Sequence, residues 1–375
     1  MGVREVLARY AAARPRPFVV AAADGTRARL AVEAELRRRG WRAAASPAET
    51  GLVVVCGEPG AELAEAVEVV WRDVPGPRAR VDLPGGTSPE DVARALDGAV
   101  ERLADLDAQR SDAQARAAAG FWTPESADEH EGMGHGHAEM GDEHGGMGNG
   151  QAGMGHGHGG HDMGGHAHHM GAPAGLAMAE RADDRDGLRL DVLHVPLGPV
   201  LNAWPAGLRV DLSLQGDVVQ AADVTVVERG GGGSFWGGRP VARRLDSVGR
   251  LAEVAGWPAA ARRAAELRDA VLDGRSPGLD AFARWIGRSW ALRWMTRGVG
   301  TVTPELAGRY GLPEGDVAAR LDGWLAQIDG RAVPRDEPSG AALAVLPELL
   351  DGVELGEARL IVASLDPDLS GGADA

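Results

Sequence analysis

The sequence contains no lysine and only one cysteine, Cys56. A single cysteine excludes a disulfide framework within the chain and any iron–sulfur site built from its own cysteines alone. It also favours a reducing compartment. No apolar run approaches the roughly 20 residues that a membrane-spanning helix needs, and residues 1–16 lack the apolar core of a signal peptide. We therefore expect a cytoplasmic protein without a transmembrane segment.

Positive charge is also scarce. The chain has 55 acidic residues against 39 basic ones, all of them arginine, and a net charge of −16. This balance argues against binding to the phosphate backbone of nucleic acids. With 375 residues, of which 44% are hydrophobic, the chain is long enough for two domains and a linker.

Histidine and methionine are concentrated in residues 130–170, which hold ten of the 11 histidines and six of the nine methionines among many glycines. Such a segment cannot bury enough apolar surface to offset its ordering entropy, so we expect disorder. Imidazole suits nickel, zinc and copper(II), and thioether sulfur suits copper(I). The candidate metal ligands are His130, His135, His137, His144, His156, His158, His161, His166, His168, His169, Met133, Met140, Met147, Met154, Met163 and Met170. A tolerated linker that binds metal only incidentally is the alternative interpretation.

Residues 1–120 alternate short apolar runs with helical patterns. Strands are predicted near residues 18–23, 52–56 and 78–83, and helices over 29–39, 62–71 and from 89, with a polar extension over 101–116. Ser88 and Pro89 are typical of a helix start. The alternation predicts an α/β domain with a small parallel, flavodoxin-like sheet.

Residues 172–375 follow the predicted disordered segment, 121–171, and are predicted to form a mainly helical α+β domain. Residues 207–219 alternate apolar and polar side chains about Gln215 and Gly216, which predicts a β-hairpin. Helices are predicted over 241–254, 259–272 and 279–296, and the indoles of the last one are expected to form a core or interface face. The isolated His194 is typical of a structural histidine rather than a catalytic base.

Two stretches of the first domain resemble a known family. Residues 52–60 and 66–78, followed by a strand, are similar to the B-type subunit of NADH-quinone oxidoreductase (complex I) and to the matching part of the hydrogenase small subunit. The resemblance implies a cluster-binding cysteine in the turn after that strand. Here the turn is formed by residues 83–86 and has no thiol, and the family's paired cysteines have no counterpart. Cys56 lies on the preceding strand and is expected to be a buried apolar side chain.

Three stretches of the second domain resemble the D-type subunit of complex I, which is related to the [NiFe] hydrogenase large subunit. They are Gly198-Pro199 with the hairpin at 216–219, residues 297–312, and the Ser-Leu-Asp-Pro sequence that ends at Pro367. The resemblance implies a quinone-facing histidine in the Gly-Pro motif and, for a hydrogenase, nickel-binding cysteine pairs. Both are missing. The family's Tyr-x-His-Arg element is replaced by the glycine-rich loop 230–238.

Three functions follow as hypotheses. The first is a degenerate complex I- or hydrogenase-like subunit without Fe–S or nickel ligands, acting as a structural or accessory partner of a respiratory complex. The second is a nickel, copper or zinc storage or delivery protein that works through residues 130–170. The third, an active quinone oxidoreductase, is least favoured because no cofactor ligand set is visible. We therefore assign no catalytic or cofactor-binding residue and leave open whether the protein is an enzyme. The expected partners are other complex I or hydrogenase-like subunits, which would hold it at the inner face of the cell membrane.

Overall fold

The computed structural model describes residue 10 and residues 12–118, 181–183, 187–275, 278–333 and 338–372. The predicted disordered segment and all its candidate metal ligands lie outside these residues. Residues 1–115 and 180–375 form one compact unit, and residues 116–179 group separately. Within the compact unit we call residues 10–115 the N-terminal half and residues 181–372 the C-terminal half.

The N-terminal half is built on a three-stranded parallel sheet with the order β1-β2-β3. The strands are β1 (Pro17–Ala21), β2 (Leu52–Cys56) and β3 (Ala79–Leu83). All five residues of the central strand β2 are buried, as a continuous apolar run predicts for a strand covered on both faces. The predicted α/β character and all three predicted strands are confirmed.

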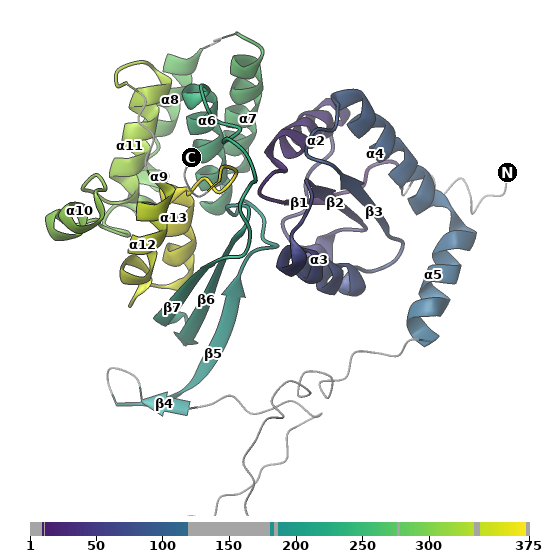
Figure 1. The fold of residues 1–375 in the computed structure, drawn as a ribbon, viewed down its shortest axis with the longest axis horizontal. Helices are drawn as coiled ribbons and strands as arrows, with labels where there is room; N and C mark the ends of the chain where they lie inside the picture. The colour runs from purple at the N-terminus through teal and green to yellow at the C-terminus, as the bar shows by residue number, and fades with distance from the viewer. Residues whose placement is uncertain are drawn as a thin grey trace, which may run out of the picture. The chain divides into compact units, whose positions relative to one another are not determined.

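Helices cover both faces of this sheet (Figure 1). The helices of this half are α2 (Thr26–Arg39), α3 (Ala61–Asp73), α4 (Pro89–Ala104) and α5 (Leu106–Ala118), with the short 3-10 helix η1 (Pro47–Glu49) before β2. Helices α2 and α4 share a core with one face of the sheet, and α3 shares a core with the other. The hydroxyl of Ser88 caps α4 by accepting from the Asp91 amide at 3.1 Å, as predicted.

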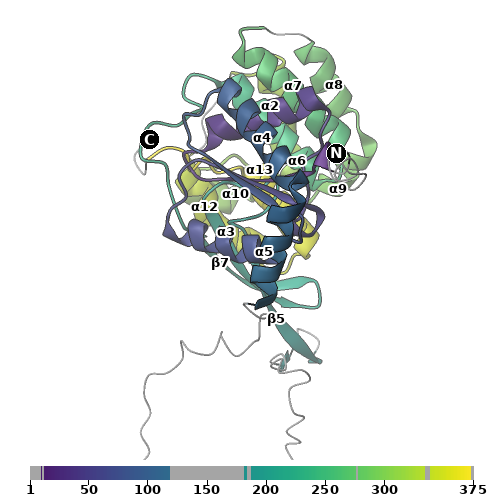
Figure 2. The ribbon, with the colours of Figure 1, turned by 90° about the vertical axis from the view of Figure 1, so that its right-hand side faces the viewer.

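The prediction that the last helix of this half continues unbroken through residue 116 is wrong. Helix α4 ends at Ala104, and the Asp105 carboxylate accepts from the amides of Asp107 at 3.1 Å and Ala108 at 3.0 Å. Asp105 therefore caps a new helix, α5, which follows α4 along the chain (Figure 2). The hydrophobic pattern did not reveal this break because both helices are polar over residues 101–116.

The C-terminal half begins with an antiparallel sheet of order β4-β5-β6-β7. Its strands are β4 (Arg181–Asp183), β5 (Arg189–Leu197), β6 (Leu208–Gln215) and β7 (Val218–Val226). Strands β6 and β7 form the predicted hairpin, and Gly216 in its turn has the positive φ of 64° that favours glycine. The side chains of Leu208, Val210, Leu212 and Leu214 alternate into the core, so the period of two in the sequence marks the buried face.

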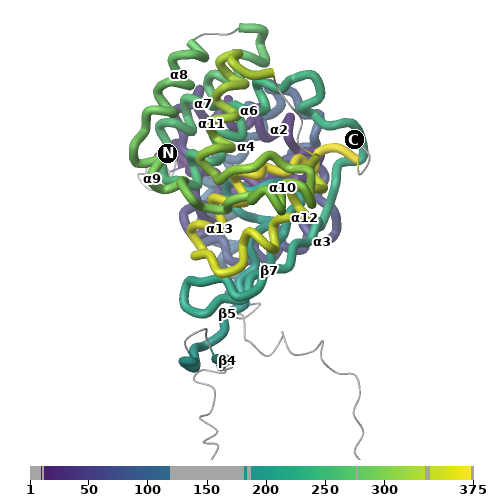
Figure 3. Tube along the Cα trace, turned by 90° about the vertical axis from the view of Figure 1, so that its left-hand side faces the viewer, coloured from purple at the N-terminus to yellow at the C-terminus, as the bar shows by residue number. Residues whose placement is uncertain are grey.

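The remainder of this half is helical. The helices are α6 (Pro240–Val254), α7 (Pro258–Leu272), α8 (Leu279–Gly287), α9 (Trp290–Thr296), α10 (Pro304–Tyr310), α11 (Val317–Ile328), α12 (Ser339–Leu350) and α13 (Leu355–Leu365). Helices α12 and α13 contact β7, so the sheet and the helices share one core (Figure 3). The mainly helical α+β character is confirmed. None of the helices among the described residues is long and apolar enough to cross a membrane.

One predicted helix of this half, over residues 279–296, is in fact two. Helix α8 ends at Gly287, and the Ser289 hydroxyl caps α9 by accepting from the Leu292 amide at 3.3 Å. The indoles of this segment were expected to form a core or interface face, and Trp290 and Trp294 are not part of the core, because they are 77% and 73% exposed. The new cap changes which residues of the segment face the core.

Candidate functional site

A cavity of about 910 Å³ lies between the N-terminal and C-terminal halves. Residues of β1 and α2 line it from one half, and residues of α6, α7 and the segment 366–370 line it from the other. Small-molecule sites commonly enclose about 300–1,000 Å³ and often form where two structural parts meet. This cavity is therefore the candidate functional site.

A closed ring of four charged side chains borders the cavity, and we call it the charge ring. Arg29 of α2 donates to Asp246 of α6 through Nη1 at 3.2 Å and Nη2 at 2.8 Å. Arg268 of α7 donates to the same carboxylate at 2.6 Å and to Glu33 of α2 at 2.8 Å. Glu33 closes the ring by accepting from Arg29 at 2.7 Å. Each carboxylate thus bridges both guanidinium groups, and the ring joins the two halves.

Burial and charge act in opposite directions on the acids of the ring. Burial by itself would raise the pKa of Asp246, but the nearby cations of Arg29, Arg250 and Arg268 outweigh it and hold that pKa well below its ordinary value. Burial also opposes ionisation of Glu33, and the guanidinium groups of Arg29 and Arg268 again lower its pKa. Both carboxylates are therefore ionised at neutral pH, when the ring has no net charge.

Helix α2 contributes its side chains to the contact with α6 and α7 because its charged residues recur every four positions. Arg29, Glu33 and Arg37 follow one another at intervals of four residues and so lie on one face of the helix. Arg37 forms an ion pair with Asp269 of α7, next to the ring. Asp269 also accepts from its neighbour Arg268, through Nε at 3.0 Å and Nη2 at 2.9 Å. A charged helix face that would usually be solvated here forms a contact between α2 and α7.

The residues after α13 bring further carboxylates to the cavity. Asp366 has a left-handed φ of 44° at the end of the helix, and its side chain is 3% exposed. It accepts from the Ser247 hydroxyl and pairs with Arg250, both at 2.5 Å. Asp368 accepts from Ser370 at 2.6 Å. The Ser-Leu-Asp-Pro end thus forms part of the cavity wall and is held there by hydrogen bonds.

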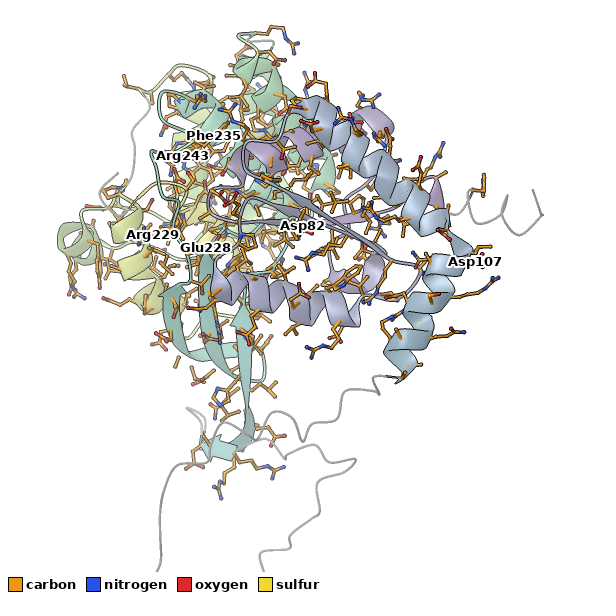
Figure 4. The ribbon with its side chains drawn as sticks, turned by 45° about the vertical axis from the view of Figure 1, so that its right-hand side comes forward. Asp82, Asp107, Glu228, Arg229, Phe235 and Arg243 are labelled. Carbon is orange, nitrogen blue, oxygen red and sulfur yellow. The ribbon has the colours of Figure 1, made fainter. Side chains whose placement is uncertain are left out.

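A second polar contact joins the halves at the carboxyl end of the parallel sheet. Glu228, which follows β7, accepts from the Gly60 amide at 2.7 Å and from the amide of Ala23, just beyond β1 (Figure 4). Gly60 is the N-cap of α3. In open α/β sheets this edge and the adjoining helix N-terminus commonly bind anionic ligands. In this chain a carboxylate of the C-terminal half lies in that position.

Cys56 and His194 are the cysteine and the histidine of the described residues, and no hydrogen bond joins either side chain to the charge ring. Cys56 is buried in β2, and burial raises its pKa to about 12, so the thiol is neutral at physiological pH. This agrees with its predicted role as a small buried side chain. His194 is exposed on β5, with Nδ1 3.2 Å from the Ser213 hydroxyl. Within the described ranges, no three or more His, Cys, Asp or Glu side chains are placed to hold a metal ion.

The sequence predicts the helices of the charge ring but not the ring itself. Arg29 and Asp246 are 217 positions apart, and each lies on a helix whose polar residues would ordinarily face solvent. The available signal was the alternation of charge at four-residue spacing along α2. That pattern also fits an exposed face, so it could not identify the partners.

Two comparisons by sequence, with protein-family models and with curated proteins, give no match for this chain.

Proposed function

We propose that this protein is a structural or accessory subunit of a respiratory or hydrogenase-like complex, in which shortened counterparts of the B-type and D-type subunits of complex I are fused in one chain. On this proposal the N-terminal half, with its small flavodoxin-like sheet, corresponds to the B-type subunit, and the C-terminal half corresponds to the D-type one. Support comes from the order of the elements: a parallel α/β half precedes an antiparallel sheet and a helical half. The protein would contribute contact surfaces rather than electron transfer.

The charge ring is the observation that carries this proposal. The facing surfaces of the two halves are joined by Arg29, Asp246, Arg268 and Glu33, which are guanidinium and carboxylate groups rather than soft metal ligands. A net-neutral ring that bridges the halves favours a role in holding them together. The burial of Cys56 in β2 also favours a structural role, because buried structural cysteines are chemically inert.

Two of the stretches that resemble the D-type subunit line the cavity. Pro199, from the Gly-Pro motif, and Asp366 and Pro367, from the C-terminal motif, are among its lining residues. Their positions support the resemblance, because motifs far apart in the sequence meet at one site. The residues that the family uses for redox chemistry are replaced there: no histidine follows Pro199, and Asp368 stands near the end of the motif where a hydrogenase would need cysteine.

The test is recovery of partners from native membranes. The tagged full chain, solubilised in mild detergent, should co-purify with respiratory or hydrogenase-like subunits in fixed stoichiometry by mass spectrometry. The variant Glu228→Gln keeps the contact's shape but weakens its hydrogen bonds, so reduced capture by this variant would show that joining the halves matters for partner binding. Recovery of no such subunit by the unmodified chain would contradict the accessory role.

Metal storage or delivery is a second candidate, favoured by the ten histidines and six methionines of residues 130–170. Deleting residues 131–170 should therefore abolish binding of nickel, copper or zinc while leaving the thermal midpoint of the compact unit unchanged. His194→Ala, outside that segment, is the matched control and should bind as the full chain does. An unchanged metal stoichiometry after the deletion would reject this function.

A further inference from the structure

Helices α8 and α9 expose three indoles. Trp285 is 43% exposed, compared with 77% for Trp290 and 73% for Trp294. The rings of Trp290 and Trp294 are stacked, with centroids 6.5 Å apart and planes inclined by 14°. Leu292 and Thr296 bury the opposite side of α9 in the core. The fold of the helix therefore holds this pair of indoles toward solvent.

Arginines are interleaved with these indoles. Residues 281–304 contain no Asp or Glu and four arginines, which are Arg284, Arg288, Arg293 and Arg297. Two of the four are neutralised by nearby carboxylates, since Arg284 pairs with Asp280 and Arg293 with Asp322. Arg288 and Arg297 are exposed and form no ion pair within the part of the chain that the structure describes. Along the chain, Arg288 lies between Trp285 and Trp290, and Arg297 lies three residues after Trp294, in a protein whose net charge is −16.

We propose that Trp285, Trp290, Trp294, Arg288 and Arg297, which we call the tryptophan–arginine surface, dock the protein on an anionic phospholipid membrane. An indole combines an apolar ring with one N–H donor and partitions to the lipid headgroup region. Arginine can place its apolar stem along the acyl boundary while its guanidinium contacts lipid phosphate. Basic and aromatic side chains on short helices are typical of proteins that lie on a membrane without crossing it.

Charge favours a membrane over a second copy of the chain. A two-fold contact through this surface would bring Arg288 and Arg297 close to the same residues of the other copy, and like charges oppose that contact. An anionic membrane instead offers many phosphates to the two free cations. The acidic remainder of the protein would be repelled by the same membrane, so this surface would be oriented toward it.

The test uses the purified full chain alone, with sedimentation on vesicles of phosphatidylcholine and on vesicles of equimolar phosphatidylcholine and phosphatidylglycerol. Binding is expected only to the second composition, together with a blue shift of tryptophan emission. Trp290→Ser with Trp294→Ser should abolish both signals. Arg288→Gln with Arg297→Gln should weaken binding by about thirtyfold, because each of the two arginines strengthens binding to an anionic surface by about five- to sixfold. Higher salt should also weaken it.

Two variants serve as matched controls. Arg42→Gln with Arg72→Gln removes two exposed arginines that also form no ion pair among the described residues, and Val69→Ser removes an apolar side chain that is 50% exposed on α3. Both should bind vesicles as the unmodified chain does, and equal thermal midpoints would establish that all variants are folded. Failure of the unmodified chain to bind anionic vesicles overturns the proposal, as does equal loss in the controls. If the unmodified chain binds no vesicles and the tryptophan variant loses a protein partner, the surface belongs to that partner instead. Because no other protein is present in the vesicle assay, its outcome is independent of the accessory role.

Discussion

Replacing Asp246 with asparagine tests the charge ring most directly. Asparagine keeps the size of the side chain but removes the charge that Arg29 and Arg268 share, and Asp246 and Arg268 are each only 2% exposed. Removing one partner of a buried ion pair costs about 3–5 kcal/mol, because the other partner is left with an uncompensated charge. We expect a loss of that size in the free energy of unfolding, even though Glu33 still contacts both arginines.

The assay is urea unfolding followed by tryptophan fluorescence and circular dichroism. Asp322→Asn is the control because its pair with Arg293 is exposed, with side-chain exposures of 51% and 42%. Such a pair contributes about 0–1 kcal/mol. The double substitution Asp246→Leu with Arg268→Met should recover part of the stability that Asp246→Asn loses, since well-packed apolar residues often replace a buried pair at little cost. If Asp246→Asn falls within about 1 kcal/mol of the unmodified protein, the ring does not hold the halves together.

Three further predictions concern pH, the thiol and one glycine. Folding lowers the pKa values of Asp246 and Glu33, so their contribution to stability is present above the ordinary carboxyl pKa of about 4 and is lost as the pH falls further. Unfolding measured as a function of pH should show this loss of stability in acid. The Asp246→Asn variant should show a smaller loss. Cys56 should resist a thiol reagent at about pH 8 until urea unfolds the protein, since burial raises its pKa to about 12, and rapid labelling of the folded protein would contradict this. Gly25→Ala would place a Cβ 1.9 Å from the Cys56 carbonyl oxygen and should lower the free energy of unfolding by at least about 2 kcal/mol. Gly86→Ala is the control and should be tolerated, because a Cβ there would meet nothing within 4 Å. Equal stabilities of the two variants would refute the close packing at Gly25.

Elements defined by local chemistry could be predicted from the sequence. The branched run of β2 indicated a strand buried on both faces, and the structure places it at the centre of the sheet. Ser88 and Pro89 marked the start of α4, and the pair Gln215-Gly216 marked the hairpin turn. In each case residues within a few positions of one another determine the conformation, so a short window of sequence contains the needed information.

The features that escaped prediction depend on distant residues or on a single competing cap. Glu228 caps α3 through Gly60, which lies 168 positions away, and the charge ring spans a still longer separation. The break between α8 and α9 depends on one hydroxyl, that of Ser289, within an otherwise continuous helical pattern. Trp290 and Trp294 were expected to form a core or interface face, and this cap turns them away from the core and toward solvent.

On the proposed function, the two folded halves form a scaffold without a redox centre of their own. The most direct measurement is the iron and acid-labile sulfide content per chain, with an absorption spectrum, of protein purified from its native host. We predict neither element in stoichiometric amount and no iron–sulfur absorption bands. A brown preparation with about one cluster per chain, able to reduce a quinone unaided, would contradict this claim.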